Sequence, residues 1–567
     1  MGLSNIEKQT VIKKANNYIK WEKEEHFRDE VALALQEEAF DELYERFYTT
    51  LTFGTAGMRG VIGGGTNRIN PFMIVLVTQA FANYLRKEIE KPTVVIAYDS
   101  RNYSKLFAKK AALTLCANGI KVFIYDEIRP VPMLSFALRY LKADAGLVIT
   151  ASHNPAKYNG YKVYWSHGGQ VTAPHDEAIV ECVKRVKAEE IKSIAESKAQ
   201  KEGLLATITT DVDNAYYALV EEKLINKALF NTTDIKVAYT PLHGAGNKPL
   251  SSLLDRFNIS YDIVKEQQLP DGDFPTVAMP NPEDPQAMRL ALELAVKNGA
   301  DIVLGTDPDA DRLGIAIPSD PTKKSYTLLN GNQIAVLLVD YLINNKKDNR
   351  IAVVIKSLVT TDLVKEIVEK RLGVCLDVLT GFKYIAEKIE ELQDSEEKFF
   401  LFGCEESFGY LFLEQIRDKD AISSAMLAVE MVAYYKANNI SLQDRLDAIY
   451  NEFGFFSEKV LSYSYEGVSG VEKMAQIMAS FRSLRTGSTF ANNLVAHKSD
   501  LLNDKNTNLP PSDVIILKFE SGDKIVVRPS GTEPKIKYYL FFKSNGESKE
   551  AFEKLVQSKT NQLKSHL

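Results

Sequence analysis

The chain has 567 residues, of which 45% are hydrophobic and 25% charged, and its net charge is -6. This composition is typical of a folded globular protein, and at roughly 150 residues per domain the length predicts three or four domains. No Lys/Arg-rich block with interleaved aromatic residues is present, which argues against nucleic-acid binding. The sequence shows no apolar run of membrane-spanning length and no secretory or myristoylation signal. Four cysteines without a CxxC pair or zinc spacing favour a reduced, cytoplasmic protein.

The first part of the chain changes from a helical pattern to an alternation of strands and helices. Residues up to about 49 have apolar positions at helical spacing and dense charge. Short apolar runs of strand character then alternate with helical stretches. They are strand 93–98, helix 104–119, strand 121–126, helix 132–143 and strand 145–150. Elements of these lengths predict a parallel sheet covered by helices.

The same alternation occurs twice more, between about 211 and 319 and between about 329 and 439, and the end of the chain differs. Residues 513–544 contain two or three strands joined by short turns, as in an antiparallel sheet, and a helix follows at 549–567. We therefore predict an α/β protein with three successive similar α/β domains, which have mixed or parallel sheets, and a C-terminal α+β domain, around a central cleft. The expected domains are 1–205, 206–320, 321–440 and 441–567.

The strongest chemical pattern follows the apolar run at 302–306. Asp307, Asp309 and Asp311 stand at alternate positions, and Arg312 comes next. Carboxylates this close repel one another, and a hard divalent cation is the usual compensation. The calcium EF-hand does not fit, because its pattern needs other residues at the later positions. Three protein carboxylates leave room for a phosphate oxygen, which favours Mg²⁺; a solvated acidic loop is the alternative.

Ser152 follows the predicted strand 145–150 and could be a hydrolase nucleophile, a turn residue or a phosphate carrier. The glycines of the hydrolase elbow are missing on both sides of it. His153 is expected to point away from Ser152, as adjacent residues do on an ordinary backbone, and so to be a poor triad base. A cation site and basic residues in glycine-rich loops are the equipment of phosphoryl transfer, which favours the phosphate carrier.

Two further loops offer groups for a phosphate and a sugar. Glu405, Glu406 and Ser407 follow the predicted strand 398–403, where carboxylates suit sugar hydroxyls; helix capping is the alternative. Walker A and kinase glycine loops are absent from the sequence, so ATP is not the expected phosphate source. The loop at 528–535 can bind phosphate through a guanidinium, hydroxyls and backbone N–H groups, or can be a plain hairpin turn. Its phosphate-binding candidates are Arg528, Ser530, Gly531 and Thr532.

Five motifs follow one another in the chain. They are "TFGTAGMRG" (52–60), "TASHNP" (150–155), "DPDADR" (307–312), "GCEESFGY" (403–410) and "RPSGTEPK" (528–535). With these motifs the sequence resembles the α-D-phosphohexomutase superfamily, most closely its phosphoglucomutase and phosphopentomutase-like branch, over nearly its whole length. The family's usual metal loop has Gly where this chain has Pro308 and Ala310, but the three aspartates and the arginine are retained.

The resemblance implies a phosphosugar mutase that interconverts hexose 1-phosphate and hexose 6-phosphate. Ser152 would carry a covalent phosphoryl group, and the three aspartates would hold Mg²⁺ against it. A sugar 1,6-bisphosphate would be both intermediate and activator, and Arg59 and Lys162 would neutralise the charge around the phosphoserine. The resemblance also implies a set of substrate-binding residues: Arg312, Thr380, Gly381, Glu405, Ser407, Arg528, Ser530, Gly531 and Thr532.

The acid/base group has two candidates. Lys419 matches the lysine that has this role in phosphoglucomutases, and Arg417 beside it is expected to lower its pKa. An ion pair of Lys419 with Asp418 or Asp420 is the structural alternative. His153 is the other acid/base candidate.

Glucose is the expected sugar, because Glu405, Glu406 and Ser407 resemble the Glu-Glu-Ser signature of phosphoglucomutases. Phosphomannomutase and phosphopentomutase activity by the same mechanism are the nearest alternatives. A Mg²⁺-dependent sugar phosphatase with Asp307 as nucleophile and an inactive sugar-phosphate-binding homologue are the others. The expected partners are small sugar phosphates, with no nucleic acid or membrane, and the expected state is a monomer or weak dimer.

Overall fold

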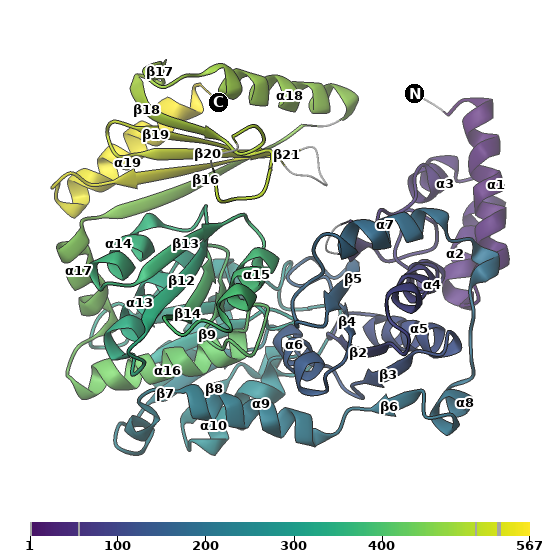
Figure 1. Ribbon diagram of the computed structural model, residues 1–567, viewed down its shortest axis with the longest axis horizontal. Coiled ribbons are helices and arrows are strands. Elements are labelled where there is room, and N and C mark those ends of the chain that lie inside the picture. The colour runs from purple at the N-terminus through teal and green to yellow at the C-terminus, as the bar shows by residue number, and fades with distance from the viewer. Residues whose placement is uncertain (1–2, 55–56, 466, 505–506, 530–534, 567) are drawn as a thin grey trace.

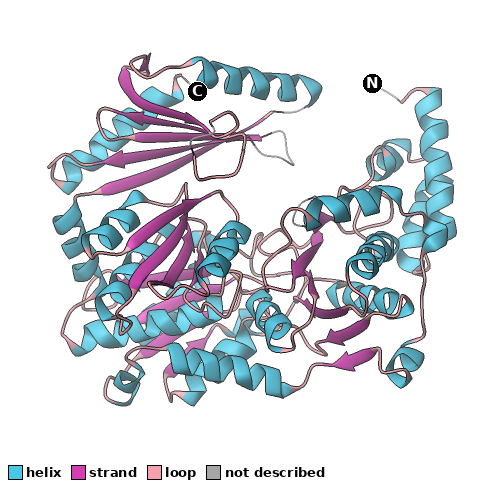
Figure 2. Cartoon of the chain, viewed as in Figure 1, coloured by secondary structure: helices cyan, strands magenta, loops and turns pink. Residues whose placement is uncertain are grey.

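The computed structural model describes residues 3–54, 57–465, 467–504, 507–529 and 535–566. These residues form an N-terminal helical segment followed by four units, each built on one sheet (Figures 1 and 2). The first three units combine strands with covering helices, and the fourth is an antiparallel sheet with two helices. The predicted α/β class with a C-terminal α+β unit is therefore confirmed.

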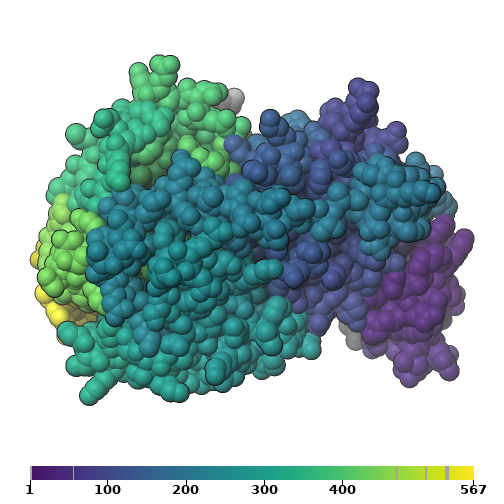
Figure 3. Space-filling model, turned by 90° about the horizontal axis from the view of Figure 1, so that it is seen from below, coloured from purple at the N-terminus to yellow at the C-terminus, as the bar shows by residue number. Residues whose placement is uncertain are grey.

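The N-terminal segment is helical, as predicted. It consists of α1 (Asn5–Trp21), α2 (Glu25–Gln36) and α3 (Phe40–Phe47). Buried Tyr18 contacts Phe47 and Phe72, so the segment packs on the first helix of the first unit. In Figure 3 it forms one end of the molecule, opposite the C-terminal helix.

The first unit has a mixed sheet. Its strands are β1 (Gly57–Val61), β2 (Thr93–Tyr98), β3 (Lys121–Ile124), β4 (Ala145–Ile149), β5 (Tyr158–Trp165) and β6 (Leu205–Thr207), in the order β1-β5-β4-β2-β3-β6. Its helices are α4 (Pro71–Glu88), α5 (Ser104–Ala117), α6 (Val131–Tyr140), α7 (His175–Arg185), η1 (Ala188–Glu190) and α8 (Glu196–Lys201). Strands β4, β2, β3 and β6 are parallel, whereas β5 is antiparallel to both of its neighbours.

The second and third units repeat this plan. The second has α9 (Thr210–Lys223), η2 (Lys227–Asn231), β7 (Lys236–Thr240), α10 (Asn247–Arg256), β8 (Ser260–Ile263), α11 (Lys265–Gln268), α12 (Pro285–Asn298), β9 (Ile302–Thr306), β10 (Leu313–Pro318) and β11 (Tyr326–Leu328). The third has α13 (Gly331–Asn345), β12 (Ile351–Ser357), α14 (Asp362–Lys370), β13 (Val374–Val378), α15 (Phe382–Leu392), β14 (Lys398–Glu405), β15 (Gly409–Leu411), α16 (Ala421–Ala437) and α17 (Leu442–Phe453). Their strand orders are β11-β10-β9-β7-β8 and β13-β12-β14-β15.

One detail of this repeated plan positions the chemistry. In each unit a parallel strand is followed by an antiparallel return strand: β4 by β5, β9 by β10, and β14 by β15. The turn between the two strands lies at the carboxyl end of the parallel strand, where open α/β sheets bind ligands. These three turns contain Ser152, the aspartates at 307–311, and Glu406 with Ser407.

The C-terminal unit is larger than its sequence suggests. It consists of β16 (Phe456–Ser464), α18 (Gly467–Ser483), β17 (Thr489–Phe490), β18 (Asn493–Asp500), β19 (Ile515–Phe519), β20 (Lys524–Pro529), β21 (Lys535–Lys543) and α19 (Lys549–Lys564). The sheet is antiparallel in the order β16-β21-β20-β19-β18-β17. The strands expected at 513–544 are present as β19, β20 and β21, and β16, β17 and β18, which precede them, were not predicted. Figure 1 shows this unit above the third unit and away from the first.

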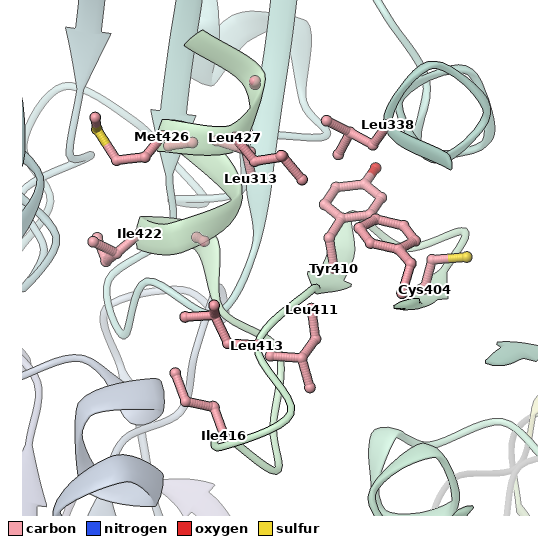
Figure 4. Close-up of a cluster of buried hydrophobic side chains, with 14 of the residues drawn as sticks. Leu313, Leu338, Cys404, Tyr410, Leu411, Leu413, Ile416, Ile422, Met426 and Leu427 are labelled. Carbon is pink, nitrogen blue, oxygen red and sulfur yellow. The ribbon is translucent and has the colours of Figure 1, made fainter. Parts of the chain in front are cut away.

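The largest hydrophobic core joins the first three units, since it contains Leu134 of α6, Leu304 of β9 and Val354 of β12. Helix α16 follows the third sheet in sequence but packs on β9, β10 and α10 of the second unit. Figure 4 shows Leu427 of α16 beside Leu313 of β10, and Leu413 and Ile416 of the segment before α16 belong to the same cluster. The predicted boundaries at 205, 320 and 440 stay a prediction.

Within the described part of the chain, no helix combines the length and the apolarity that crossing a membrane requires.

Candidate active site

Ser152 lies in the turn after β4 and is held in an uncommon backbone conformation. Its φ is +50°, which costs a non-glycine residue about 1–2 kcal/mol. Ser152 is 8% exposed, and its Oγ donates a hydrogen bond to Asp307 Oδ2 at 2.7 Å. His153 Nδ1 lies 3.2 Å from the same Oγ, so the expectation that His153 points away was wrong. The left-handed turn at Ser152 brings the two adjacent side chains together.

The three aspartates form one buried cluster from the β9–β10 turn. One carboxylate oxygen from each of Asp307, Asp309 and Asp311 lies within 4.8 Å of the others. Burial, together with the two neighbouring aspartates, raises the pKa of Asp307 well above its usual range. Asp309 Oδ1 and Asp311 Oδ1 have no hydrogen-bond partner among the described residues. Unpartnered, closely spaced carboxylate oxygens are the donor set that a hard divalent cation needs.

Two lysines from different units compensate part of this negative charge. Lys162 of β5 places its Nζ 3.1 Å from Asp309, and Lys419 places its Nζ 3.1 Å from Asp311. Burial alone would raise the pKa of Asp311, but Lys419 and Lys162 outweigh burial and lower that pKa to about 2. The site therefore draws side chains from all three α/β units.

Arg417 does not act on Lys419 as expected. Its guanidinium is buried and donates to Glu390 Oε2 at 3.0 Å. Burial would lower the pKa of Lys419, but the carboxylates of Asp311 and Asp418 outweigh it and raise the pKa above its usual range. The expected lowering was wrong, because Lys419 lies among carboxylates. The ion pair with Asp418, at 3.1 Å, is present as well as the contact with the cluster.

His153 is neutral in this environment. Burial and the nearby charge of Arg312 lower its pKa to about 2. Arg312 itself forms an ion pair with Glu283 and leaves its Nε without a hydrogen-bond partner among the described residues. Arg59 is exposed, and its Nη1 donates to Asn154 Oδ1 at 3.3 Å, so it lies beside the turn that carries Ser152.

The predicted sugar loop is a compact unit. Glu405 is 6% exposed, and its carboxylate accepts a hydrogen bond from the backbone N–H of Gly381 at 2.8 Å. Gly381 has φ +122° and directly precedes α15, with half-buried Thr380 before it. Half-buried Ser407 follows two residues after Glu405 in the β14–β15 turn. The structure thus brings Thr380 and Gly381 next to the Glu405 loop.

Arg528 lies at the end of β20, opposite Lys537 of β21, and is half-buried. Ser530, Gly531 and Thr532 lie outside the described residues, and so do residues 55–56 of the first motif. Their assignments to the phosphate loop stay predictions.

Sequence reasoning missed two residues beneath the serine turn. Asp99 and Arg101 follow β2, are buried, and pair at 3.3 Å. Arg101 donates to the backbone carbonyl of Ser152. Polar residues directly after a buried parallel strand were the available signal, since Asp99 to Asn102 stand where β2 ends.

A serine hydroxyl beside a cluster of three carboxylates, with lysines from two units around them, is an arrangement suited to phosphoryl transfer in a multidomain α/β protein. The chain matches phosphoglucomutase/phosphomannomutase alpha/beta/alpha domain I over residues 50–190, domain II over 214–320 and domain III over 330–453. It therefore belongs to the phosphoglucomutase/phosphomannomutase family.

Individual relatives agree with this membership. A phosphoglucomutase of Staphylococcus epidermidis is 38% identical over 510 residues, 88% of this chain and 92% of the relative. A phosphoglucomutase of Staphylococcus aureus is 36% identical over 551 residues, 95% of this chain and 96% of the relative. Among solved structures, the Paramecium phosphoprotein pp63/parafusin, a phosphoglucomutase, is 18% identical with a TM-score of 0.71 over 91% of this chain and 96% of its own. A putative phosphomannomutase of Thermus thermophilus is 22% identical with a TM-score of 0.68 over 91% and 99%. At these low sequence identities, the two solved structures support the fold of this chain alone.

Proposed function

We propose that this chain interconverts α-D-glucose 1-phosphate and glucose 6-phosphate through a phosphoserine at Ser152 and a glucose 1,6-bisphosphate intermediate. Its membership of the family and its relatives make it a hexose phosphate mutase, an isomerase. The single observation that carries the mechanism is Ser152 Oγ, 2.7 Å from Asp307 in a three-carboxylate cluster. A serine so placed is suited to hold a phosphoryl group beside a cation.

Mg²⁺ is the proposed metal, held by Asp307, Asp309, Asp311 and the phosphorylated Ser152. The fit is supported by the two buried carboxylate oxygens without a partner among the described residues. It is also supported by the raised pKa of Asp307, which results from burial and from the neighbouring carboxylates of Asp309 and Asp311. The cation would supply the charge neutralisation that phosphoryl transfer needs.

The protein's own residues then have distinct tasks. Lys162 and Arg59 flank the serine turn and offset the charge of the phosphoryl group. His153 Nδ1, 3.2 Å from Ser152 Oγ, is placed to exchange the serine proton. Lys419, which reaches the cluster from the third unit, is placed to exchange the proton of the reacting sugar hydroxyl.

The substrate has two binding regions in this proposal. Glu405 and Ser407, with Thr380, Gly381 and Arg312 beside them, bind the sugar hydroxyls and the phosphate near the reacting end. A carboxylate and a hydroxyl two residues apart suit adjacent equatorial hydroxyls of glucose, whereas ribose would leave buried polar groups unpaired. The distal phosphate is bound by the C-terminal loop, through Arg528, Ser530, Gly531 and Thr532.

Two further proposals concern the setting of the enzyme. A cytoplasmic location is supported by the four cysteines, which are free thiols. A monomer or weak dimer stays a prediction.

The test is a comparison of kcat/KM for the 1-phosphates of glucose, mannose, glucosamine and ribose, with Mg²⁺ and glucose 1,6-bisphosphate. Glucose should give the highest value, and Ser152→Ala should lose turnover while keeping its thermal unfolding midpoint. A higher value for mannose or ribose would contradict the glucose assignment. Release of inorganic phosphate in place of the 6-phosphate would favour the phosphatase, and full activity of Ser152→Ala would rule out the phosphoserine.

A further inference from the structure

The turn that carries Ser152 is held from below by one buried arginine. We propose that Arg101 is the positioning residue that sets the place of the reacting hydroxyl, and that Phe274 of the second unit keeps Arg101 in its place. Because the role assigned to Arg101 is in phosphoryl transfer from Ser152, this inference rests on the proposed function.

Arg101 binds the backbone of the serine turn at four points. Its Nη2 donates to the carbonyl oxygens of Ser152 and Asn154, and its Nη1 donates to those of Pro155 and Tyr158 at 3.0 Å each. The side chain is 0% exposed. A planar guanidinium can serve four acceptors on two of its nitrogens, whereas a lysine ammonium offers three donors from one point. The pattern therefore fits arginine specifically.

Asp99 completes this support. It accepts hydrogen bonds from Ser104 Oγ at 2.7 Å and from the backbone N–H of Arg101 at 2.9 Å, and it faces Arg101 Nε at 3.3 Å. Thr150 Oγ1 lies 2.7 Å from Asp99 and accepts the backbone N–H of Ser152 at 2.8 Å. The left-handed conformation of Ser152 is thus fixed through both its N–H and its carbonyl oxygen, and a strained backbone needs such over-determination.

Residues of the second unit contact Arg101 and its neighbour Asn102 directly. The ring of Phe274 lies 5.0 Å from the guanidinium carbon of Arg101, within the range of a cation–π contact. Next to it, Asn102 Nδ2 donates to Asp273 Oδ1 at 2.6 Å. Since the second unit also carries Asp307, this contact links the position of the serine turn to that of its partner carboxylate.

A buried arginine can also serve stability alone, and Arg129 provides the matched control. It is 4% exposed, bridges the same two units by an ion pair with Asp213 at 2.8 Å, and stacks on the Tyr125 ring at 5.3 Å. The other hydrogen bonds of its guanidinium go to Glu127 and Ile128. It therefore resembles Arg101 in burial and pairing but is not bonded to the serine turn.

The experiment compares Arg101→Lys with Arg129→Lys in the full chain by unfolding midpoint, steady-state kinetics and amide hydrogen exchange of residues 150–158. Both variants should unfold at a lower temperature. Arg101→Lys alone should lower kcat by about tenfold to a hundredfold with little change in KM, because a misplacement near 1 Å has that effect on a reacting group. It alone should also speed exchange in the serine turn. Unchanged kcat in Arg101→Lys, or an equal loss in Arg129→Lys, would overturn the proposal.

Phe274→Leu covers the case in which Arg101→Lys does not fold. It keeps the guanidinium but removes the ring, and we expect a severalfold loss of kcat and faster exchange at residues 150–158; no change in either would overturn the proposal. Hydrogen exchange does not depend on turnover. A wild-type protein without mutase activity would refute the proposed function, while exchange would still test the positioning role.

Discussion

The junction between the first and second units differs from the junction between the third unit and the C-terminal unit. At the first, buried Ser152 and Thr150 donate hydrogen bonds to Asp307 and Asp309 of the aspartate cluster. Buried Arg101 contacts the ring of Phe274 in the second unit. At the second, buried apolar side chains of both units, among them Leu358 and Val526, form one cluster. Ion pairs such as Lys524 with Asp362 at 2.6 Å lie beside it, next to cavities of about 570 Å³ and 980 Å³.

This contrast separates two demands of one reaction. In the proposed reaction the Ser152 hydroxyl must keep its position relative to the carboxylates, and dense hydrogen bonding in a close-packed region resists displacement. In the same proposal the C-terminal loop has to admit and release the sugar, and a junction with cavities beside it has fewer contacts to break when it opens. We therefore expect the C-terminal unit to close on substrate while the serine junction stays fixed.

The largest expected effect comes from weakening the close-packed junction at Asp309. Asp309→Asn should weaken Mg²⁺ binding and lower kcat by about a hundredfold, because one neutralised ligand removes part of the charge stabilisation of the transferred group. Calorimetric titration with Mg²⁺ and steady-state kinetics would measure both effects. The control is Asp301→Asn at the other end of β9, where Asp301 pairs with Lys323 at 2.7 Å. Activity that survives exhaustive chelation would contradict the metal assignment.

A smaller effect is expected at the junction with the C-terminal unit. Arg528→Ala should raise KM by about tenfold to a hundredfold, the value of a hydrogen bond to a charged group, and should lower kcat less. The exposed Lys518→Ala in the same sheet is the control and should change neither constant. Small-angle scattering of the wild type should show compaction with glucose 1,6-bisphosphate. Identical scattering profiles at saturation would count against closure.

The fold and the centre of the site were predictable because their signals are local. Apolar runs of strand length gave the parallel strands, and the polar residues directly after β4 and β9 marked Ser152 and the aspartates. The carboxyl ends of parallel strands share one edge of a sheet, so these groups had to lie at ligand-binding edges. The antiparallel direction of β5, β10 and β15 was not predictable, because the apolar pattern of a strand does not give its direction relative to its neighbours.

The remaining features depend on contacts between distant residues. The carbonyl groups that Arg101 binds lie some fifty residues later in the chain. The positive φ of Ser152 brings His153 to its hydroxyl, and no glycine at this position indicates such a backbone conformation. Arg417 donates to Glu390 because α15, which precedes it by some twenty-seven residues, places that carboxylate beside the guanidinium. Strand β16 was not predicted, because it is a half-exposed edge strand with charged residues and so lacks an apolar run.

The smallest expected effect concerns Glu406, which lies where the sugar loop faces the C-terminal unit. Burial and the neighbouring Glu405 raise its pKa to about 7, with Glu283 adding to the rise, and Lys537 of β21 faces it from the C-terminal unit. At a pH between 4.5, the usual pKa, and about 7, the Glu406 carboxyl is therefore protonated in the folded state and has lost its proton in the unfolded state. This contribution to stability is complete below pH 4.5 and is lost as the pH rises through about 7. Between pH 5.5 and 8 the loss of stability should amount to about 1–2 kcal/mol.

Glu406→Gln should remove that part of the difference in unfolding midpoint between the two pH values, and the exposed Glu177→Gln should leave it in place. If Glu406→Gln shows the wild-type difference, Glu406 is not a titrating group at this junction.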